Sequence, residues 1–297
     1  MIEWSRLWPD RPGKEERSML KRVYVEITNV CNLSCTFCPG TRRSPAFMAP
    51  ADFALVLRRL RGVTEHIYLH VMGEPLLHPE LPTLLALAGE AGYKVYVTTN
   101  GTLLGERGAL LLTAPAVKKV SVSLHSMEGN GVEVLTDYLE AVWAFAQKAP
   151  AAGIICALRL WNLGGADRRN GEILSFLEGK LGAHPLELPQ PRRGSWRLGE
   201  SLYLEQAERF DWPDLAAAEQ DTRFCLALRD QAAVLADGTV VPCCLDHEGD
   251  IPLGNIFAAS MEEILASPRA RALYEGFSQG KPAEALCRRC GFATRFG

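Results

Sequence analysis

The sequence predicts an α/β fold, with about six strand–helix units in a barrel-like or open parallel sheet and a different style of structure after them. Apolar runs of strand length alternate with longer helical patterns over residues 1–190. Alternation of this kind is typical of parallel strands joined by crossover helices. Farther along, an Asp-Gly pair between two short apolar runs predicts a β-hairpin, and short helices follow it.

The predicted elements follow one another in regular order. Short runs rich in β-branched and aromatic residues predict strands, and longer amphipathic runs predict the helices between them. Arg, Gly and Pro are frequent just after residue 190, so we interpret residues 191–224 as a connector. Strands are expected at residues 23–28, 66–71, 94–98, 119–124, 154–160, 186–188, 231–236 and 239–241, and helices at residues 51–60, 81–89, 103–112, 132–146, 171–181, 261–266 and 269–275.

One face of the predicted sheet is polar. Side chains two residues apart in a strand share a face, and polar side chains recur at that spacing in strand after strand. Because buried polar groups need partners, a curled sheet of this kind would enclose a concave interior that binds a polar ligand or water. The alternative is an antiparallel sheet with one face in water, which the long intervening helices disfavour. The polar positions are Tyr24, Glu26, Thr28, His66, Tyr68, His70, Tyr96, Thr98, Asn100, Ser121, Ser123, His125 and Arg159.

Composition and charge exclude several classes of protein. The 297 residues carry 32 basic and 35 acidic side chains, a net charge of −3, so we expect no nucleic-acid partner. The sequence contains no apolar run of about eighteen residues and no apolar signal core, so we expect no membrane span and a cytoplasmic location. In that reducing compartment the nine cysteines are expected to bind metal rather than to form disulfides.

Three cysteines, Cys31, Cys35 and Cys38, lie in the loop after the first predicted strand. Three thiolates from one tight loop can hold three irons of a [4Fe–4S] cube and leave the fourth iron open to an exogenous chelator. The alternative is structural zinc, which usually takes four protein ligands. A loop with three cysteines, and with Phe37 before the last of them, fits zinc poorly and therefore favours a cluster.

A second group of five cysteines lies in the C-terminal part of the sequence. Four thiolates that converge on a small hairpin-plus-helix unit would complete one further cluster with no open iron. The alternative is a structural zinc held by four thiolates. Cys156 is separate from both groups, and its place on the apolar face of a strand predicts a core residue. The second group consists of Cys225, Cys243, Cys244, Cys287 and Cys290.

The first cysteine group resembles the CxxxCxΦC signature of radical S-adenosylmethionine (SAM) enzymes, with Phe37 as the aromatic residue. Further matches stand in the order expected of that family. Residues 72–75 read Met-Gly-Glu-Pro and are similar to the family's GGEP motif, with Met in place of the first Gly. The third predicted strand ends in Thr-Thr-Asn-Gly at residues 98–101, and the fourth carries Ser-Val-Ser-Leu-His at residues 121–125.

This resemblance implies a partial (β/α)6 parallel barrel as the radical SAM core. It also implies a [4Fe–4S] cluster held by Cys31, Cys35 and Cys38, with SAM chelated to the open iron. The residues that it implies as contacts of SAM are Phe37, Gly73, Glu74, Pro75, Thr98, Asn100, Ser121, Ser123 and His125.

The second cysteine group resembles the twitch domain, a shortened SPASM domain that carries an auxiliary [4Fe–4S] cluster after a radical SAM barrel. Residues 241–246 and 253–256 are also similar to SPASM sequence. The resemblance implies a barrel at residues 1–190, the connector at 191–224 and the auxiliary domain at 225–297. The spacing leaves open whether Cys243 or Cys244 is the ligand. The implied ligands are Cys225, Cys243, Cys287 and Cys290.

The family resemblance implies an enzyme that cleaves SAM reductively to a 5′-deoxyadenosyl radical, which abstracts hydrogen from the substrate. A fully ligated auxiliary cluster would accept an electron, so we expect a dehydrogenase-like oxidation of a small molecule. An external one-electron reductant such as flavodoxin or ferredoxin is the expected partner. The alternatives are modification of a peptide or protein side chain, lyase or epimerase chemistry without net oxidation, and a non-catalytic Fe–S or zinc protein. About 22 residues precede the first predicted strand, too few for the leader-binding domain of many peptide modifiers.

Arg159 is the expected catalytic residue outside the cysteine groups. An arginine is rarely buried unpaired in an apolar strand. We expect its guanidinium to bind a substrate anion or the carboxylate of SAM. The alternative is a salt bridge to Glu26 or to another carboxylate of the interior.

Overall fold

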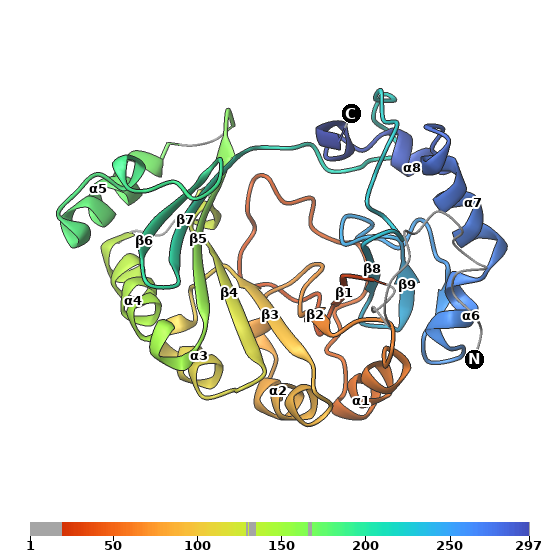
Figure 1. The fold of residues 1–297 in the computed structure, drawn as a ribbon, viewed down its shortest axis with the longest axis horizontal. Helices are drawn as coiled ribbons and strands as arrows, with labels where there is room; N and C mark the ends of the chain where they lie inside the picture. Colours follow the sequence, from red (N-terminus) through yellow and green to blue (C-terminus); the bar gives the residue numbers. More distant parts are fainter. Residues whose placement is uncertain (1–19, 129, 131–134, 166–167, 297) are drawn as a thin grey trace.

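The computed structural model describes residues 20–128, 130, 135–165 and 168–296. Within them, one ten-stranded sheet curls around an open interior, with strand order β10-β9-β8-β1-β2-β3-β4-β5-β7-β6 (Figure 1). All strand pairs from β8 to β7 are parallel, and antiparallel strands complete both ends. The predicted α/β fold with a partial parallel barrel is therefore confirmed. The strands are β1 (Arg22–Val25), β2 (His66–Tyr68), β3 (Lys94–Thr99), β4 (Val117–Ser123), β5 (Ile155–Leu163), β6 (Ser195–Gly199), β7 (Leu202–Glu208), β8 (Gln231–Val234), β9 (Thr239–Val241) and β10 (Gly254–Asn255).

Helices cover the outer face of the curled sheet (Figure 1). α1 begins at Pro50, whose fixed φ suits the first turn of a helix, and α5 ends at Gly182, which takes the left-handed conformation that closes many helices. In the described part of the chain, no helix is both long and apolar enough to span a membrane. The helices are α1 (Pro50–Arg59), α2 (Leu81–Glu90), α3 (Leu104–Leu112), α4 (Leu135–Lys148), α5 (Asn170–Leu181), α6 (Met261–Leu265), α7 (Pro268–Ser278) and α8 (Ala285–Arg288).

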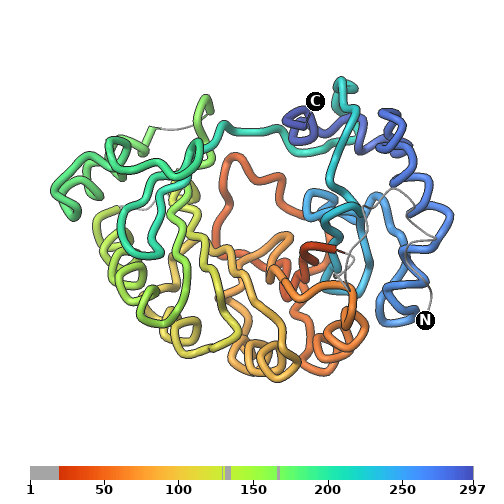
Figure 2. The backbone as a smooth tube through the Cα atoms, viewed as in Figure 1, coloured from red at the N-terminus to blue at the C-terminus, as the bar shows by residue number. Residues whose placement is uncertain are grey.

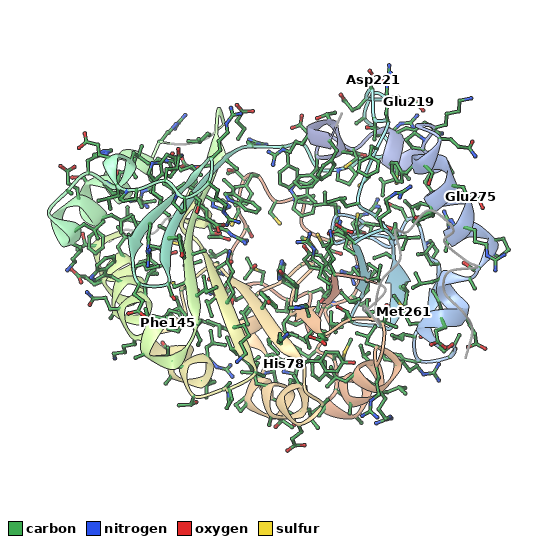
Figure 3. The ribbon with its side chains drawn as sticks, viewed as in Figure 1. His78, Phe145, Glu219, Asp221, Met261 and Glu275 are labelled. Atoms are coloured by element: carbon green, nitrogen blue, oxygen red, sulfur yellow. The ribbon has the colours of Figure 1, made fainter. Side chains whose placement is uncertain are left out.

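The hydrophobic core lies between the sheet and these helices. Val23, Ile67, Val95 and Val120 are nearly or completely buried, and each alternates along its strand with polar neighbours. Because successive side chains of a strand point to opposite faces, the polar neighbours point to the inside of the curve. His78, labelled in Figure 3, belongs to the outer layer near α2, where its Nε2 lies 3.0 Å from the carbonyl oxygen of Met48.

The sixth strand of the barrel differs from the prediction. Residues 185–188, expected to include a strand, instead form a 3₁₀ helix (Pro185–Glu187). Proline at the start of that segment favours a helical turn, because its ring fixes φ near the value that a first turn needs. The strand that pairs parallel with β5 is β7, and β6 pairs antiparallel with β7 at the sheet edge. The segment interpreted as a connector therefore contributes two strands to the sheet.

The C-terminal hairpin is continuous with the barrel sheet. β8 pairs parallel with β1 along its whole length, from Arg22–Gln231 to Val25–Val234. Asp237 and Gly238 make the predicted turn between β8 and β9, with Gly238 at φ +83°. Figure 2 shows this region beside the start of the barrel, while the long loop after β1 runs inside the curve of the sheet. The hairpin thus brings the second cysteine group to the edge of the interior.

Candidate active site

The three-cysteine loop is closed at its base by two polar side chains that follow β1. Asn29 donates from Nδ2 to the Ser44 carbonyl at 2.9 Å and accepts from the Ala46 amide at 2.8 Å. Thr28 Oγ1 donates to the Ala46 carbonyl at 2.8 Å. These side-chain bonds, together with a backbone bond from the Met48 amide to the Ile27 carbonyl at 2.8 Å, hold together the two ends of the loop that contains the first cysteine group.

Asparagine side chains approach two of the three thiols. Asn130 Nδ2 lies 3.3 Å from Cys35 Sγ, and its Oδ1 accepts from the Ser34 amide at 2.9 Å. Asn100 Nδ2 lies 3.9 Å from Cys31 Sγ. Burial raises the pKa of all three thiols, so they would ionise on binding a cation that stabilises the thiolates. Three thiols from one loop fit an iron–sulfur cluster, in which each thiolate binds one iron.

The Met-Gly-Glu-Pro segment packs directly against the start of this loop. Gly73 has φ +76°, and a Cβ on it would lie 2.5 Å from the Thr28 carbonyl oxygen, so only glycine fits there. The Glu74 carboxylate accepts from the Leu76 amide at 3.0 Å and from Thr99 Oγ1 and the Asn100 amide at 2.7 Å each. The Glu74 side chain therefore joins the segment after β2 to the end of β3. The contact between Glu74 and SAM that the resemblance implies stays a prediction.

A cavity of about 630 Å³ occupies the inside of the curved sheet. Part of the expected polar face lines it, whereas Glu26, Thr28, His66, Tyr96, Asn100 and Ser121 do not. Phe37 also lines it, and its ring centroid lies 4.8 Å from that of His125. Burial lowers the pKa of His125 to about 4 and that of His70 to about 3, so both imidazoles are neutral near pH 7. The expected polar residues on the cavity wall are Tyr24, Tyr68, His70, Thr98, Ser123, His125 and Arg159.

Several residues expected to contact SAM do not line this cavity. Pro75 is buried at the start of a short 3₁₀ helix, and Ser121 is buried within β4. Asn100 lies beside the cysteine loop, where it donates to Asn32 Oδ1 at 2.9 Å. Gly73 and Glu74 also lie beside the start of the loop, where the Glu74 amide donates to the Val30 carbonyl at 2.8 Å.

Arg159 lies on the cavity wall as expected, but its partner was only partly foreseen. Its Nε lies 3.3 Å from Glu205 Oε2, and its guanidinium stacks 4.3 Å from the centroid of the Trp161 ring. Glu205 also accepts from Lys119 Nζ at 2.9 Å and from Arg192 Nη2 at 2.8 Å. A salt bridge to an interior carboxylate is therefore present, and that carboxylate is Glu205 rather than Glu26.

Glu26 instead joins three parts of the chain. Its carboxylate is fully buried and accepts two hydrogen bonds from the Arg43 guanidinium, each 2.7 Å long. It also accepts from the backbone amides of Met72 at 3.0 Å and Ala236 at 3.2 Å. One carboxylate thus ties the cysteine loop, the Met-Gly-Glu-Pro segment and the C-terminal hairpin together.

The second cysteine group forms a pocket of its own. Ile251, Phe277 and Leu286 supply its apolar lining. Burial raises the pKa of Cys225 to about 11, and burial together with the neighbouring thiols raises the pKa of Cys243 and Cys287. Close thiols that disfavour each other's ionisation fit a bound cationic cluster. The four cysteines on the pocket wall are Cys225, Cys243, Cys287 and Cys290.

Adjacent cysteines of the hairpin face different spaces. Cys243 lines the four-cysteine pocket, whereas Cys244 lines the barrel cavity with Tyr24. Cys156 is fully buried in the core, as its place in the strand predicted. In the described ranges, no group of three or more His, Cys, Asp or Glu side chains is arranged to hold a single metal ion. A cubic iron–sulfur cluster does not need thiolates that converge on one ion, because each thiolate binds a different iron of the cube.

Sequence reasoning missed several residues of the site. Glu205 stands in β7 in an alternating apolar–polar run, a pattern that would have revealed it had this segment not been interpreted as a connector. Lys119 stands two residues before Ser121 and four before Ser123 in β4, so the same spacing of two places it on the polar face of the strand. Asn130 and Arg43 lie in loops, and no pattern in the sequence marks them.

Two family models match the chain. The radical SAM superfamily model matches residues 25–177, and the SPASM model, described as an iron-sulfur cluster-binding domain, matches residues 225–291. Both matches agree with the resemblances predicted from the two cysteine groups.

Curated relatives share part of the chain. A GTP 3′,8-cyclase of Synechococcus sp. (strain WH7803) is 33% identical over 122 residues, which cover 37% of this chain and 35% of the relative. A probable GTP 3′,8-cyclase of Sulfurisphaera tokodaii is 33% identical over 144 residues, 45% of this chain and 44% of the relative. A PqqA peptide cyclase of Xanthomonas campestris pv. campestris (strain B100) is 27% identical over 219 residues, 71% of this chain and 57% of the relative. Each match thus spans less than two thirds of the relative.

Solved structures share the fold over nearly the whole chain. BtrN in complex with AdoMet and 2-DOIA aligns with a TM-score of 0.58 at 16% identity, over 92% of this chain and 93% of that one. Streptococcus suis SuiB aligns with a TM-score of 0.62 at 15% identity, over 92% of this chain and 71% of that one. The anSMEcpe protein with bound AdoMet aligns with a TM-score of 0.60 at 14% identity, over 93% of this chain and 94% of that one. At these identities the likeness shows the fold alone.

Proposed function

Because the chain belongs to the radical SAM superfamily and carries a SPASM domain, we propose that it oxidises a small molecule bound in the cavity between its two cysteine groups. Membership of the superfamily makes SAM and a [4Fe–4S] cluster its cofactors, and the SPASM domain adds auxiliary iron–sulfur binding. The proposal concerns the substrate class, the direction of the reaction and the residues that carry it.

One observation carries the proposal: the same cavity is lined by a residue next to the first cysteine group and by a cysteine of the second. Phe37, next to Cys38, lines the cavity at the three-cysteine loop. Cys244, next to Cys243, lines it at the C-terminal hairpin. A substrate in this space would lie near both groups, as an oxidation needs when a hydrogen atom and an electron leave the substrate in separate steps.

When bound, SAM and the two clusters supply a 5′-deoxyadenosyl radical that abstracts hydrogen and an acceptor for one electron. Cys31, Cys35 and Cys38 would hold the first cluster. The polar wall would orient the substrate, and the curved sheet would keep water from the reacting atoms. Phe37 packs against His125, and this contact connects the cysteine loop to that wall.

The auxiliary cluster would take its ligands from the four-cysteine pocket. The placement of Cys243 beside Cys225, Cys287 and Cys290 supports Cys243 as the fourth ligand. Cys244 faces the cavity and is the matched non-ligand. A pocket that provides four thiols offers no protein-free iron, which suits electron transfer better than binding of a second SAM.

A short peptide is the second candidate substrate. The match to a PqqA peptide cyclase covers more of this chain than the matches to the two GTP 3′,8-cyclases do. The solved structures of similar fold include SuiB bound to the precursor peptide SuiA. These relatives support peptide modification as the alternative to small-molecule oxidation.

The test is an anaerobic assay with the reconstituted protein, SAM and dithionite. Deuterated pools of lysate metabolites and of short peptides are supplied separately, and transfer of deuterium to 5′-deoxyadenosine is followed by mass spectrometry. We expect transfer from the metabolite pool, together with a product two hydrogens lighter than its precursor. Transfer from the peptide pool alone would replace the proposal with peptide modification, and the absence of 5′-deoxyadenosine formation would overturn radical SAM activity itself.

A further inference from the structure

The cavity wall carries a large excess of positive charge. Among the described residues that line it, Glu205 is the one carboxylate, and five side chains are basic. The histidines of the wall are neutral near pH 7, because burial lowers the pKa of each. The basic side chains are Arg22, Lys119, Arg159, Arg192 and Arg209.

Three of these cations share the single carboxylate. Lys119 and Arg192 both donate to Glu205 Oε1, at 2.9 Å and 2.8 Å, and Arg159 donates to Oε2 at 3.3 Å. We call Lys119, Arg159 and Arg192 the basic wall. One carboxylate neutralises one of the three charges, so a net charge of two positive units remains on this wall.

The basic wall runs from the interior to the mouth of the cavity. The side chains of Arg159 and Lys119 are 15% and 20% exposed, whereas that of Arg192 is 68% exposed. Burial lowers the pKa of both Arg159 and Lys119, although Glu205 acts in the opposite direction. An arriving anion would therefore meet an exposed cation first and desolvated cations deeper inside, where charge-assisted hydrogen bonds are strongest.

Two buried nitrogen atoms on the same cavity have no hydrogen-bond partner among the described residues. They are Nδ1 of His70 and Nε of Arg22. Buried polar atoms are normally satisfied, so two unpaired nitrogens in residues that line the cavity show that this part of the wall is under-satisfied by the protein alone. The guanidinium of Arg22 lies 5.9 Å from the centroid of the Tyr68 ring, which is a cation–π contact and not a hydrogen bond.

Four aromatic rings form a second part of the cavity wall, which we call the aromatic side. Phe210 lies 5.6 Å from Trp212 and 5.0 Å from Phe292, measured between ring centroids, and Phe296 lies 5.7 Å from Phe292. All four rings line the cavity. A wall of this kind binds the apolar or planar part of an organic molecule rather than a bare inorganic ion.

From these observations we propose that the substrate is an organic anion, whose phosphate or carboxylate group is bound by the basic wall and whose apolar or ring part faces the aromatic side. The inference rests on the proposed function, because it names the class of substrate for the same cavity. Both anionic groups offer oxygens that match guanidinium and ammonium donors, so the experiment distinguishes between them.

The experiment measures binding to the anaerobically reconstituted holoenzyme by isothermal titration calorimetry. The probes are phenyl phosphate, benzoate and the neutral benzyl alcohol. We expect at least one anion to bind at least tenfold more tightly than benzyl alcohol, and the stronger anion identifies phosphate or carboxylate. Equal binding of all three probes would overturn the inference.

Variants then separate an anion site from a merely structural ion cluster. We expect Arg159→Gln and Lys119→Gln each to weaken anion binding by about tenfold or more, since each removes a charge-assisted bond. Glu205→Gln should leave the affinity unchanged or raise it, because it removes the competing carboxylate. A structural cluster would instead lose binding in all three variants. Lys180→Gln, which removes a charge from a distant surface pair with Glu140, is the matched control.

Two further measurements test the inference where the first variants give no answer. Should Glu205→Gln fail to fold, Arg192→Gln at the exposed mouth provides the test, with weaker anion binding expected and unchanged binding contradicting the inference. Anion binding is repeated with saturating SAM, and complete competition would assign the basic wall to the carboxylate of SAM. Formation of 5′-deoxyadenosine is measured in parallel: its presence without anion binding refutes this inference alone, whereas its absence in the wild type refutes the proposed function.

Discussion

The two cysteine groups are built in opposite ways. The first lies on one loop, and Cys31 in it is exposed. The second comes from three separate stretches of chain, the segments around Cys225, Cys243 and the Cys287–Cys290 pair, and Cys290 is buried. Hydrogen bonds from asparagine side chains position the first group, whereas apolar packing positions the second.

This difference indicates which of the two sites can take an external ligand on its cluster. The first group supplies three thiols, and its exposed Cys31 leaves room for an external ligand on a cluster, which suits the SAM that family membership requires. The second pocket supplies four thiols beside the apolar side chains of Ile251, Phe277 and Leu286, which suits a cluster that only exchanges electrons.

The largest effect is expected when the first cysteine group is removed. Replacing Cys31, Cys35 and Cys38 together with Ala should reduce 5′-deoxyadenosine formation to background, because a cluster without its thiolates is lost. Iron content should fall from about eight to about four per chain if both clusters are [4Fe–4S]. Liquid chromatography of the anaerobic reaction measures the product. Cys156→Ala is the control, since Cys156 is a fully buried core residue, and undiminished product from the triple variant would refute the assignment.

A matched pair of variants sharpens the comparison at the second group. Cys243→Ala should lose about four irons per chain, while Cys244→Ala should keep about eight, because only Cys243 lines the four-cysteine pocket. Both variants should still form 5′-deoxyadenosine. Iron analysis and electron paramagnetic resonance measure the outcome, and the reverse pattern would make Cys244 the ligand.

The sequence predicted the polar interior because a strand fixes the side-chain period at two residues. That period alone was enough to assign His70, Thr98, Ser123 and Arg159 to one surface, and all four line the cavity. The same period explains why the choice between neighbouring cysteines could not be predicted. Adjacent residues in extended chain point to opposite sides, and only the tertiary fold decides which side holds the pocket.

Other features depend on contacts between distant parts of the chain. Glu205 pairs with Lys119 across 86 positions, and Glu26 accepts from Ala236 across 210. A single sequence carries no sign of such pairs. The sixth strand was misplaced for a local reason, because the apolar run at residues 186–188 follows a proline that starts a 3₁₀ turn.

A smaller effect is expected where the two regions are joined. Glu26→Gln should lower the free energy of unfolding by about 3 kcal/mol or more, since it leaves the Arg43 guanidinium without its buried counter-ion. Denaturant unfolding under anaerobic conditions measures this change. Lys94→Met breaks the exposed pair with Glu65 and should cost less than about 1 kcal/mol. Equal effects of the two variants would show that Glu26 does not connect the regions.

The smallest expected effect concerns the support of the first loop. Asn130→Ala removes hydrogen bonds to Cys35 and to the Ser34 amide, a loss of about 1 kcal/mol. We expect chelators to remove iron from the first cluster a few times faster, with the auxiliary cluster unchanged. Gln147→Ala, which removes an exposed amide on α4, is the control. Equal acceleration at both clusters would contradict a local role for Asn130.

The most direct test of the central claim asks whether one substrate lies between both cysteine groups. The Cys243→Ala variant is incubated anaerobically with SAM, dithionite and the deuterated pool that the wild type consumes. We predict 5′-deoxyadenosine that carries deuterium but no oxidised product, because hydrogen abstraction survives and electron removal does not. Oxidised product formed at the wild-type rate would contradict the account.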